Sequence, residues 1–115
     1  MKKIVFLLFA VLLLQGCTRT EAAFDDFARC LSSKGIKMYG TDTCPHCKNQ
    51  KEFFKGSFDL ISYVNCESKP AECQKQEITG YPTWIIDGKK YPGERSLSAL
   101  AELSGCSIVE EAAEK

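Results

Sequence analysis

A pair of cysteines separated by two residues constrains this chain more than any other feature of its sequence. Cys44-Pro45-His46-Cys47 follows a short apolar segment and opens a stretch with a helical pattern. A helix N-terminus and a neighbouring imidazole such as that of His46 both favour a thiolate, so Cys44 is the expected nucleophile. Cys47 lies one turn further along and suits the resolving role, and Pro45 fits the first turn, where its missing N–H is harmless. The motif predicts a redox centre whose only cofactor is its own disulfide.

Other uses of a Cys-x-x-Cys pair fit this chain less well. A closed zinc site takes four ligands, but His46 is the only histidine and the other cysteines are scattered. Attachment of a c-type haem requires histidine directly after the second cysteine, where this chain has Lys48. A metal site or a purely structural disulfide therefore stays open only as an alternative, and no metal is expected.

Length and composition favour one secreted or envelope domain. The chain has 115 residues, enough for one globular core. Its seven cysteines indicate an oxidising compartment, because cytosolic thiols are kept reduced. The 15 basic and 15 acidic residues balance and form no basic run, so nucleic acid is not an expected partner.

The N-terminal segment predicts export and lipid anchoring. Residues 4–14 form an uncharged apolar run after two lysines, which is too short to span a bilayer but suits a signal peptide. Leu14-Gln15-Gly16-Cys17 resembles a bacterial lipobox, which predicts a signal peptide over 1–16, lipidation of Cys17 and a tether over 17–23. Acylation of Cys17 leaves six cysteines, an even number; ordinary signal cleavage nearby is the alternative. The expected location is the bacterial cell envelope, anchored in a membrane and facing the periplasm or the exterior.

The remaining chain reads as one α/β domain over 24–106, followed by an acidic tail over 107–115. Apolar spacing and turn residues predict these elements in order: helix 24–34, strand 36–40, helix 45–55 with Phe53 and Phe54 inward, strand 60–64, helix 71–76, strand 83–86, return strand 89–91 and helix 97–104. Asp87-Gly88 is a hairpin signal, and Ser96 is a plausible N-cap. This order predicts a small mixed β-sheet flanked by helices in three layers.

The order of elements and the cysteine motif resemble the thioredoxin fold over residues 24–106. Gly80-Tyr81-Pro82-Thr83 looks like the cis-proline segment of that superfamily, placed before the hairpin. The resemblance implies that Pro82 faces the redox pair and that Tyr81 flanks an extended substrate segment. An ordinary proline at a strand edge is the alternative reading of Pro82.

Cys-Pro-His-Cys is similar to the motif of the DsbA-type periplasmic oxidants, but the chain is too short for their inserted helical domain. A closer resemblance is to the thioredoxin-like domain associated with bacterial vitamin K epoxide reductase homologues. It rests on these segments: Phe27-Ala28-x-Cys30-Leu31, Met38-Tyr39-Gly40, Cys44-Pro45-His46-Cys47, Gly80-Tyr81-Pro82-Thr83-Trp84 and Gly105-Cys106. The resemblance implies a membrane partner that passes electrons to quinone.

One position departs from ordinary thioredoxins. Six residues before the first active-site cysteine, where those proteins carry a buried acid, this chain has Met38. Deprotonation of Cys47 is therefore expected to depend on water or on another base.

Four further cysteines allow three pairings. We expect structural disulfides Cys30–Cys106 and Cys66–Cys73; a second redox pair at Cys66–Cys73 is the alternative.

The Cys44-Pro45-His46-Cys47 motif favours a thiolate, which stabilises the reduced pair and makes its disulfide more oxidising. The expected function is therefore oxidation of exported cysteine-containing proteins. The alternatives are a reductase or isomerase kept reduced by a membrane partner, and a non-enzymatic lipoprotein that binds metal or partners.

Overall fold

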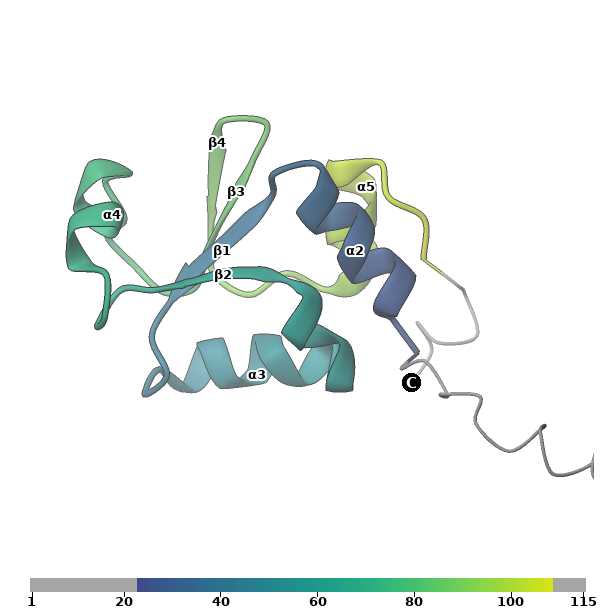
Figure 1. Cartoon of the computed structure of the whole chain (residues 1–115), viewed down its shortest axis with the longest axis horizontal. Helices are drawn as coiled ribbons and strands as arrows, with labels where there is room; N and C mark the ends of the chain where they lie inside the picture. Colours follow the sequence, from purple (N-terminus) through teal and green to yellow (C-terminus); the bar gives the residue numbers. More distant parts are fainter. Residues whose placement is uncertain (1–22, 109–115) are drawn as a thin grey trace, which may run out of the picture.

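The computed structural model describes residues 23–108, whose course is shown in Figure 1. The elements are α2 (Asp25–Ser33), β1 (Lys37–Gly40), α3 (Pro45–Phe53), η2 (Lys55–Leu60), β2 (Ser62–Asn65), α4 (Pro70–Lys75), β3 (Thr83–Ile86), β4 (Lys89–Pro92) and α5 (Leu97–Ser104). The predicted signal peptide 1–16 and the lipidation site Cys17 lie outside the described residues, as does most of the tail 107–115.

The four strands form one mixed sheet in the order β2-β1-β3-β4. β1 pairs in parallel with β2, and α3 and η2 make the crossover between them. β1 pairs antiparallel with β3, and β3 pairs antiparallel with β4 through the turn at Asp87-Gly88. The α/β class and the small mixed sheet expected from the sequence are confirmed.

Alternating side chains of the sheet divide the apolar residues into two clusters, because neighbours along a strand point to opposite faces. Met38 lies in the larger cluster with Trp84, its partner on β3. Helices α2, α3 and α5 contribute to the same cluster. Tyr39 lies in the smaller cluster with Val64 and the Cys66–Cys73 disulfide, against α4. Figure 1 shows α4 set apart from the other three helices, so the sheet is the middle of three layers.

The segment between α3 and β2 differs from the sequence expectation. The prediction that Phe53 points inward is wrong: Phe53 is 40% exposed, whereas Phe54 is fully buried. Successive helical residues point about 100° apart. The face of α3 that packs against the core is narrow, so it can bury only one of the adjacent residues Phe53 and Phe54. The chain then forms the 3-10 helix η2, in which Phe58 packs edge-on against Phe54. Strand β2 therefore begins at Ser62 rather than at residue 60.

Gln50 fixes α3 against the second half of the domain. Its fully buried side chain accepts hydrogen bonds through Oε1 from the indole N–H of Trp84 at 3.0 Å and the backbone N–H of Arg95 at 2.7 Å. Its Nε2 donates to the Arg95 carbonyl at 2.9 Å. A buried amide is tolerated when its hydrogen bonds are made, and these three tie α3 to β3 and to the loop before α5.

Two disulfides close the fold. Cys30 on α2 is bonded to Cys106 after α5, with Cα atoms 5.9 Å apart, and Cys66 is bonded to Cys73, with Cα atoms 5.7 Å apart. The first joins the two ends of the domain, and the second holds α4 beside the end of β2. Over residues 23–108 the structure contains no helix that is long and apolar enough to cross a bilayer.

Candidate active site

Cys44 begins helix α3. It is the N-cap residue, with extended backbone angles φ −73° and ψ 121°, and Pro45 occupies the first turn. Its Sγ accepts a hydrogen bond from the backbone N–H of Cys47 at 3.4 Å. Cys44 is partly exposed, so its sulfur meets both the positive end of the helix dipole and solvent. This is the environment in which a thiolate attacks an external disulfide.

Cys47 is fully buried one turn into α3. Its sulfur packs against the backbone of Gly40 at the end of β1: a Cβ at that position would lie 2.7 Å from Cys47 Sγ. Burial raises the pKa of the Cys47 thiol to about 11, and a backbone hydrogen bond from Thr41 acts in the opposite direction. In the reduced protein Cys47 is thus a buried, protonated thiol, whereas Cys44 is partly exposed.

The segment before β3 faces Cys44, which brings together the residues that the sequence assigned to substrate contact. The Tyr81–Pro82 peptide bond is cis, and the Cys44 thiol donates to the Tyr81 carbonyl at 3.7 Å. Pro82 is fully buried, whereas Tyr81 is 42% exposed. The Pro82 carbonyl accepts a hydrogen bond from the Gly93 N–H at 2.7 Å, which holds the segment against the end of β4. The Tyr81 carbonyl therefore lies beside the Cys44 thiol, and the Tyr81 side chain is partly exposed to solvent.

His46 contacts a partner that the sequence pattern did not reveal. Its Nδ1 lies 3.0 Å from Glu94 Oε1 in the loop before α5. The His46 side chain is 73% exposed and that of Glu94 is 26% exposed. The imidazole is therefore exposed to solvent and lies next to a carboxylate.

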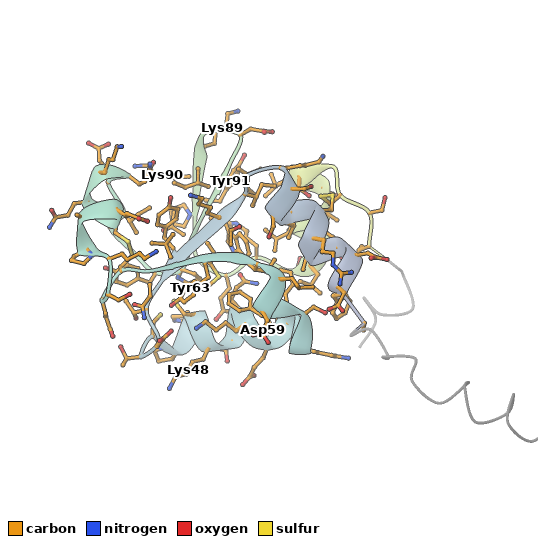
Figure 2. The ribbon with its side chains drawn as sticks, in the orientation of Figure 1. Lys48, Asp59, Tyr63, Lys89, Lys90 and Tyr91 are labelled. Carbon is orange, nitrogen blue, oxygen red and sulfur yellow. A yellow bond between two sulfur atoms is a disulfide. The ribbon has the colours of Figure 1, made fainter. Side chains whose placement is uncertain are left out.

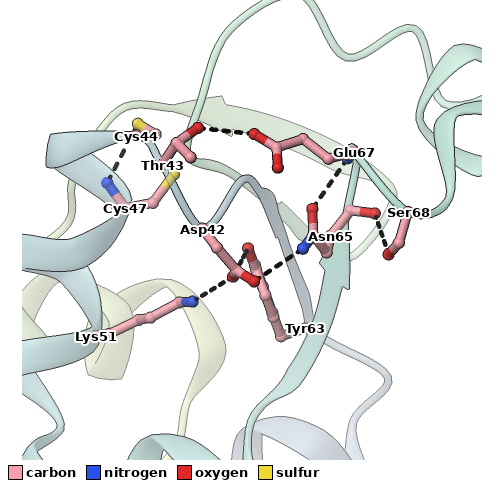
Figure 3. Close-up of polar contacts among 9 residues, drawn as sticks. All are labelled: Asp42, Thr43, Cys44, Cys47, Lys51, Tyr63, Asn65, Glu67 and Ser68. Atoms are coloured by element: carbon pink, nitrogen blue, oxygen red, sulfur yellow. Dashed lines mark hydrogen bonds and ion pairs between the residues drawn. The ribbon is translucent and has the colours of Figure 1, made fainter.

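A second polar cluster lies on the Cys47 side of α3, and Figure 3 shows it. Asp42 accepts hydrogen bonds from Lys51 Nζ at 3.0 Å, Tyr63 Oη at 3.1 Å and Asn65 Nδ2 at 3.0 Å. The Lys51 ammonium and the Tyr63 hydroxyl hold the pKa of the Asp42 carboxyl below its usual range. Burial, followed by the bond to Asp42, raises the pKa of Tyr63. We call these four residues the Asp42 cluster.

The other four cysteines of the described residues are joined in two disulfides. Within residues 23–108 the free thiols are those of Cys44 and Cys47, while Cys66 and Cys73 are buried in a disulfide. The same part of the chain holds no group of three His, Cys, Asp or Glu side chains arranged to bind a metal ion.

Sequence reasoning missed Gly40, Glu94 and the Asp42 cluster. The contacts of Glu94 and Asp42 depend on how the loop before α5 and strand β2 pack against α3, which no local pattern encodes. One signal was present: Lys51 follows Cys47 by four residues, and that spacing places two helical side chains on the same face.

Comparisons with known proteins agree with this geometry. The chain is 39% identical over 90 residues to the thiol-disulfide oxidoreductase LTO1 of Arabidopsis thaliana, covering 70% of this chain and 24% of that protein. It is 36% identical over 91 residues to the thioredoxin domain-containing protein 5 homolog of Drosophila melanogaster, covering 66% and 22%. It is 37% identical over 73 residues to the protein disulfide isomerase-like 2-1 of Oryza sativa subsp. japonica, covering 51% and 20%. No family model matches the chain.

The observed sheet and helices, read with these relatives, show an α/β thioredoxin-like fold. The relatives' names support a thioredoxin-like family and a thiol–disulfide oxidoreductase activity. The chain spans about a quarter of the length of the first relative and about a fifth of the others.

Proposed function

We propose that this protein is a thiol–disulfide oxidoreductase in which Cys44 exchanges disulfides with substrate and Cys47 resolves them. The observation that carries the proposal is the position of Cys44 Sγ, at the N-terminus of α3 and 3.7 Å from the Tyr81 carbonyl beside Pro82. A nucleophilic sulfur and a peptide backbone available to an extended substrate are the two parts that such a reaction needs.

In the oxidising direction, a substrate thiolate attacks Cys44 Sγ of the Cys44–Cys47 disulfide. The enzyme disulfide breaks, a mixed disulfide forms at Cys44, and Cys47 leaves as a thiolate that takes up a proton. A second substrate thiolate then attacks the substrate sulfur of the mixed disulfide and releases Cys44 as a thiolate. Two electrons pass from the substrate thiols to the enzyme pair.

The proposed direction is oxidation. In the reduced protein the Cys44 sulfur accepts a hydrogen bond from the Cys47 N–H and lies at the positive end of α3, and His46 follows Cys44 by two residues. Interactions that stabilise the reduced form make the disulfide a stronger oxidant. The exposed His46 strengthens this effect when it is protonated.

The proposed substrates are exported proteins that contain cysteines, and the proposed location is the bacterial cell envelope through a lipid on Cys17. The seven cysteines and the N-terminal apolar run support this placement. A quinone-linked membrane oxidoreductase of the vitamin K epoxide reductase type is the proposed acceptor of electrons from Cys44 and Cys47. Support for that partner comes from the sequence resemblance described above.

Reduction or isomerisation of disulfides is the second candidate, because two of the relatives described above carry thioredoxin-domain and protein disulfide isomerase names. Equilibration of the full chain with glutathione redox buffers separates the two. We expect a reduction potential of about −120 mV for the Cys44–Cys47 pair, as in a strong oxidant; a value of about −270 mV would assign the reductant instead.

The matched control is the Cys66→Ala/Cys73→Ala variant, read by alkylation and mass spectrometry. If the Cys66–Cys73 disulfide is purely structural, the reduction potential of the Cys44–Cys47 pair is the same in this variant as in the unsubstituted protein. A shifted potential in this variant, or reduction of the Cys66–Cys73 disulfide of the unsubstituted protein in the same potential range as the active pair, would instead make Cys66 and Cys73 a second redox pair.

A further inference from the structure

Beyond the backbone hydrogen bond from Thr41, the buried Cys47 thiolate needs charge stabilisation that Met38 does not supply. In thiol–disulfide exchange Cys47 is the leaving thiolate in one direction and the attacking thiolate in the other. Met38 is fully buried and apolar, so it offers neither a base nor a charge. A thiolate in an apolar setting is unfavourable unless a positive charge or a hydrogen bond compensates it.

The Asp42 cluster places one cation on this side of the helix. Lys51 follows Cys47 by one turn of α3, and its ammonium lies 4.2 Å from the centre of the Tyr63 ring and 3.0 Å from Asp42. The Tyr63 ring in turn borders the space in front of Gly40 that Cys47 Sγ fills, since a Cβ on Gly40 would lie 3.5 Å from Tyr63 Cε2. Figure 2 shows Tyr63 between β2 and α3, while Lys48 extends from the outer side of α3.

The Lys51 side chain is only 28% exposed, because three contacts hold it in this position. Asp42 anchors the ammonium, and the rings of Tyr63 and Phe58 lie beneath it, the latter at 5.5 Å. Asp42 is itself held by Tyr63 and Asn65 from β2. A lysine ammonium fixed in this way acts as a positioned point charge rather than a solvated one.

We propose that Lys51, oriented by Asp42 and the Tyr63 ring, is a positioning residue that stabilises the Cys47 thiolate during disulfide exchange. This inference rests on the proposed function. When a mixed disulfide joins Cys44 to a substrate, Cys47 loses its proton to solvent and its thiolate attacks Cys44 Sγ. The Cys44–Cys47 bond forms, and the substrate leaves as a thiolate. In the opposite direction the same charge favours departure of Cys47.

The titratable and charged groups around Cys47 come from three sides. Cys44 and Lys51 belong to its own helix, Asp42 to the loop after β1, and Tyr63 to β2. Of these, Cys44 raises the pKa of Cys47 and Lys51 lowers it. The Asp42 carboxylate accepts hydrogen bonds from three donors, one of which is the Lys51 ammonium.

A two-step reaction of the reduced full chain with an aryl disulfide, followed by stopped-flow absorbance, tests the inference. The first aryl thiolate is released when Cys44 attacks, and the second when Cys47 resolves the mixed disulfide. Lys51→Met keeps the apolar stem and removes the charge; we expect it to slow the second release about tenfold at neutral pH and leave the first within about twofold. Because Cys47 is a thiol at neutral pH, the second rate should rise about tenfold per pH unit there, and the whole profile of Lys51→Met should shift to higher pH.

Lys51→Arg keeps the charge and should restore the second release to within about threefold of the unsubstituted protein. Lys48→Met, which removes a charge from the outer side of the same helix, is the matched control and should leave both releases unchanged.

The Cys44→Ser/Cys47→Ser variant measures any aryl thiolate released by reaction with Cys17. Lys51→Gln replaces Lys51→Met if the latter does not fold. A second release that is equally fast with and without the Lys51 charge, or equally slowed by Lys48→Met, would overturn the inference. Absence of the first release in the unsubstituted protein would instead overturn the proposed function, and the inference with it.

Discussion

A Gly40→Ala variant is expected to lose about 100-fold in the rate of disulfide exchange and about 2 kcal/mol in the free energy of unfolding. The new methyl group would lie 2.7 Å from Cys47 Sγ, a separation at which one of the two must move. The backbone of Gly40 is held between its neighbours, because its carbonyl accepts from the Cys66 N–H at 2.8 Å. We therefore expect Cys47 Sγ to be displaced from its present position. Urea unfolding and oxidation of a synthetic two-cysteine peptide measure the two effects.

A double-mutant cycle with Cys47→Ala isolates the cause of the destabilisation. Removing the Cys47 sulfur leaves Tyr63 Cε2 as the next neighbour, at an ordinary contact distance of 3.5 Å. Gly40→Ala should then cost less than about 1 kcal/mol in that background, since mutations of residues in contact are not additive. An equal cost in both backgrounds would show that the space in front of Gly40 is not reserved for the Cys47 sulfur.

Removal of the Cys30–Cys106 disulfide is expected to destabilise the domain by about 4 kcal/mol in a Cys30→Ser/Cys106→Ser variant. The bond joins residues 76 positions apart, so it restricts most of the unfolded chain. A domain of this size has about 5–15 kcal/mol of stability in total, so the variant should be only marginally folded. Urea unfolding of the oxidised proteins, monitored by far-ultraviolet circular dichroism, gives the difference.

The shorter disulfide is the internal control for this chain-entropy argument. Cys66 and Cys73 are 7 positions apart, and their removal should cost about 2.5 kcal/mol. Equal losses from the two pairs, or a smaller loss from Cys30–Cys106, would contradict the assignment of that bond as the main covalent support of the fold.

The elements predicted most closely are those with local signals. Asp87-Gly88 predicted the hairpin between β3 and β4. Ser96 and Gly105 marked the two ends of α5, where they are the N-cap and the left-handed C-cap. These features depend on the conformational freedom of one or two residues. The region after α3 was less predictable, because the choice between helix, 3-10 helix and strand at residues 55–61 depends on packing of Phe54 and Phe58.

For the candidate site, the sequence indicated the chemistry but not its surroundings. The spacing of Cys44 and Cys47 and the Tyr81-Pro82 segment pointed to residues that the structure brings together. The predicted pairings 30–106 and 66–73 are those present in the structure. The contact of Lys51 with Tyr63 arises from the parallel pairing of β1 with β2 beside α3, which sequence spacing alone does not specify.

The proposal on which the others rest is that Cys44 Sγ is the atom through which this protein exchanges disulfides. Its most direct test is to express the Cys47→Ala variant, quench the cells with acid, and identify cysteine-linked peptides by mass spectrometry. We expect mixed disulfides between Cys44 and cysteines of exported proteins, which persist because the resolving thiol is missing. Recovery of Cys44 as a free thiol, or of adducts only at other cysteines, would contradict it.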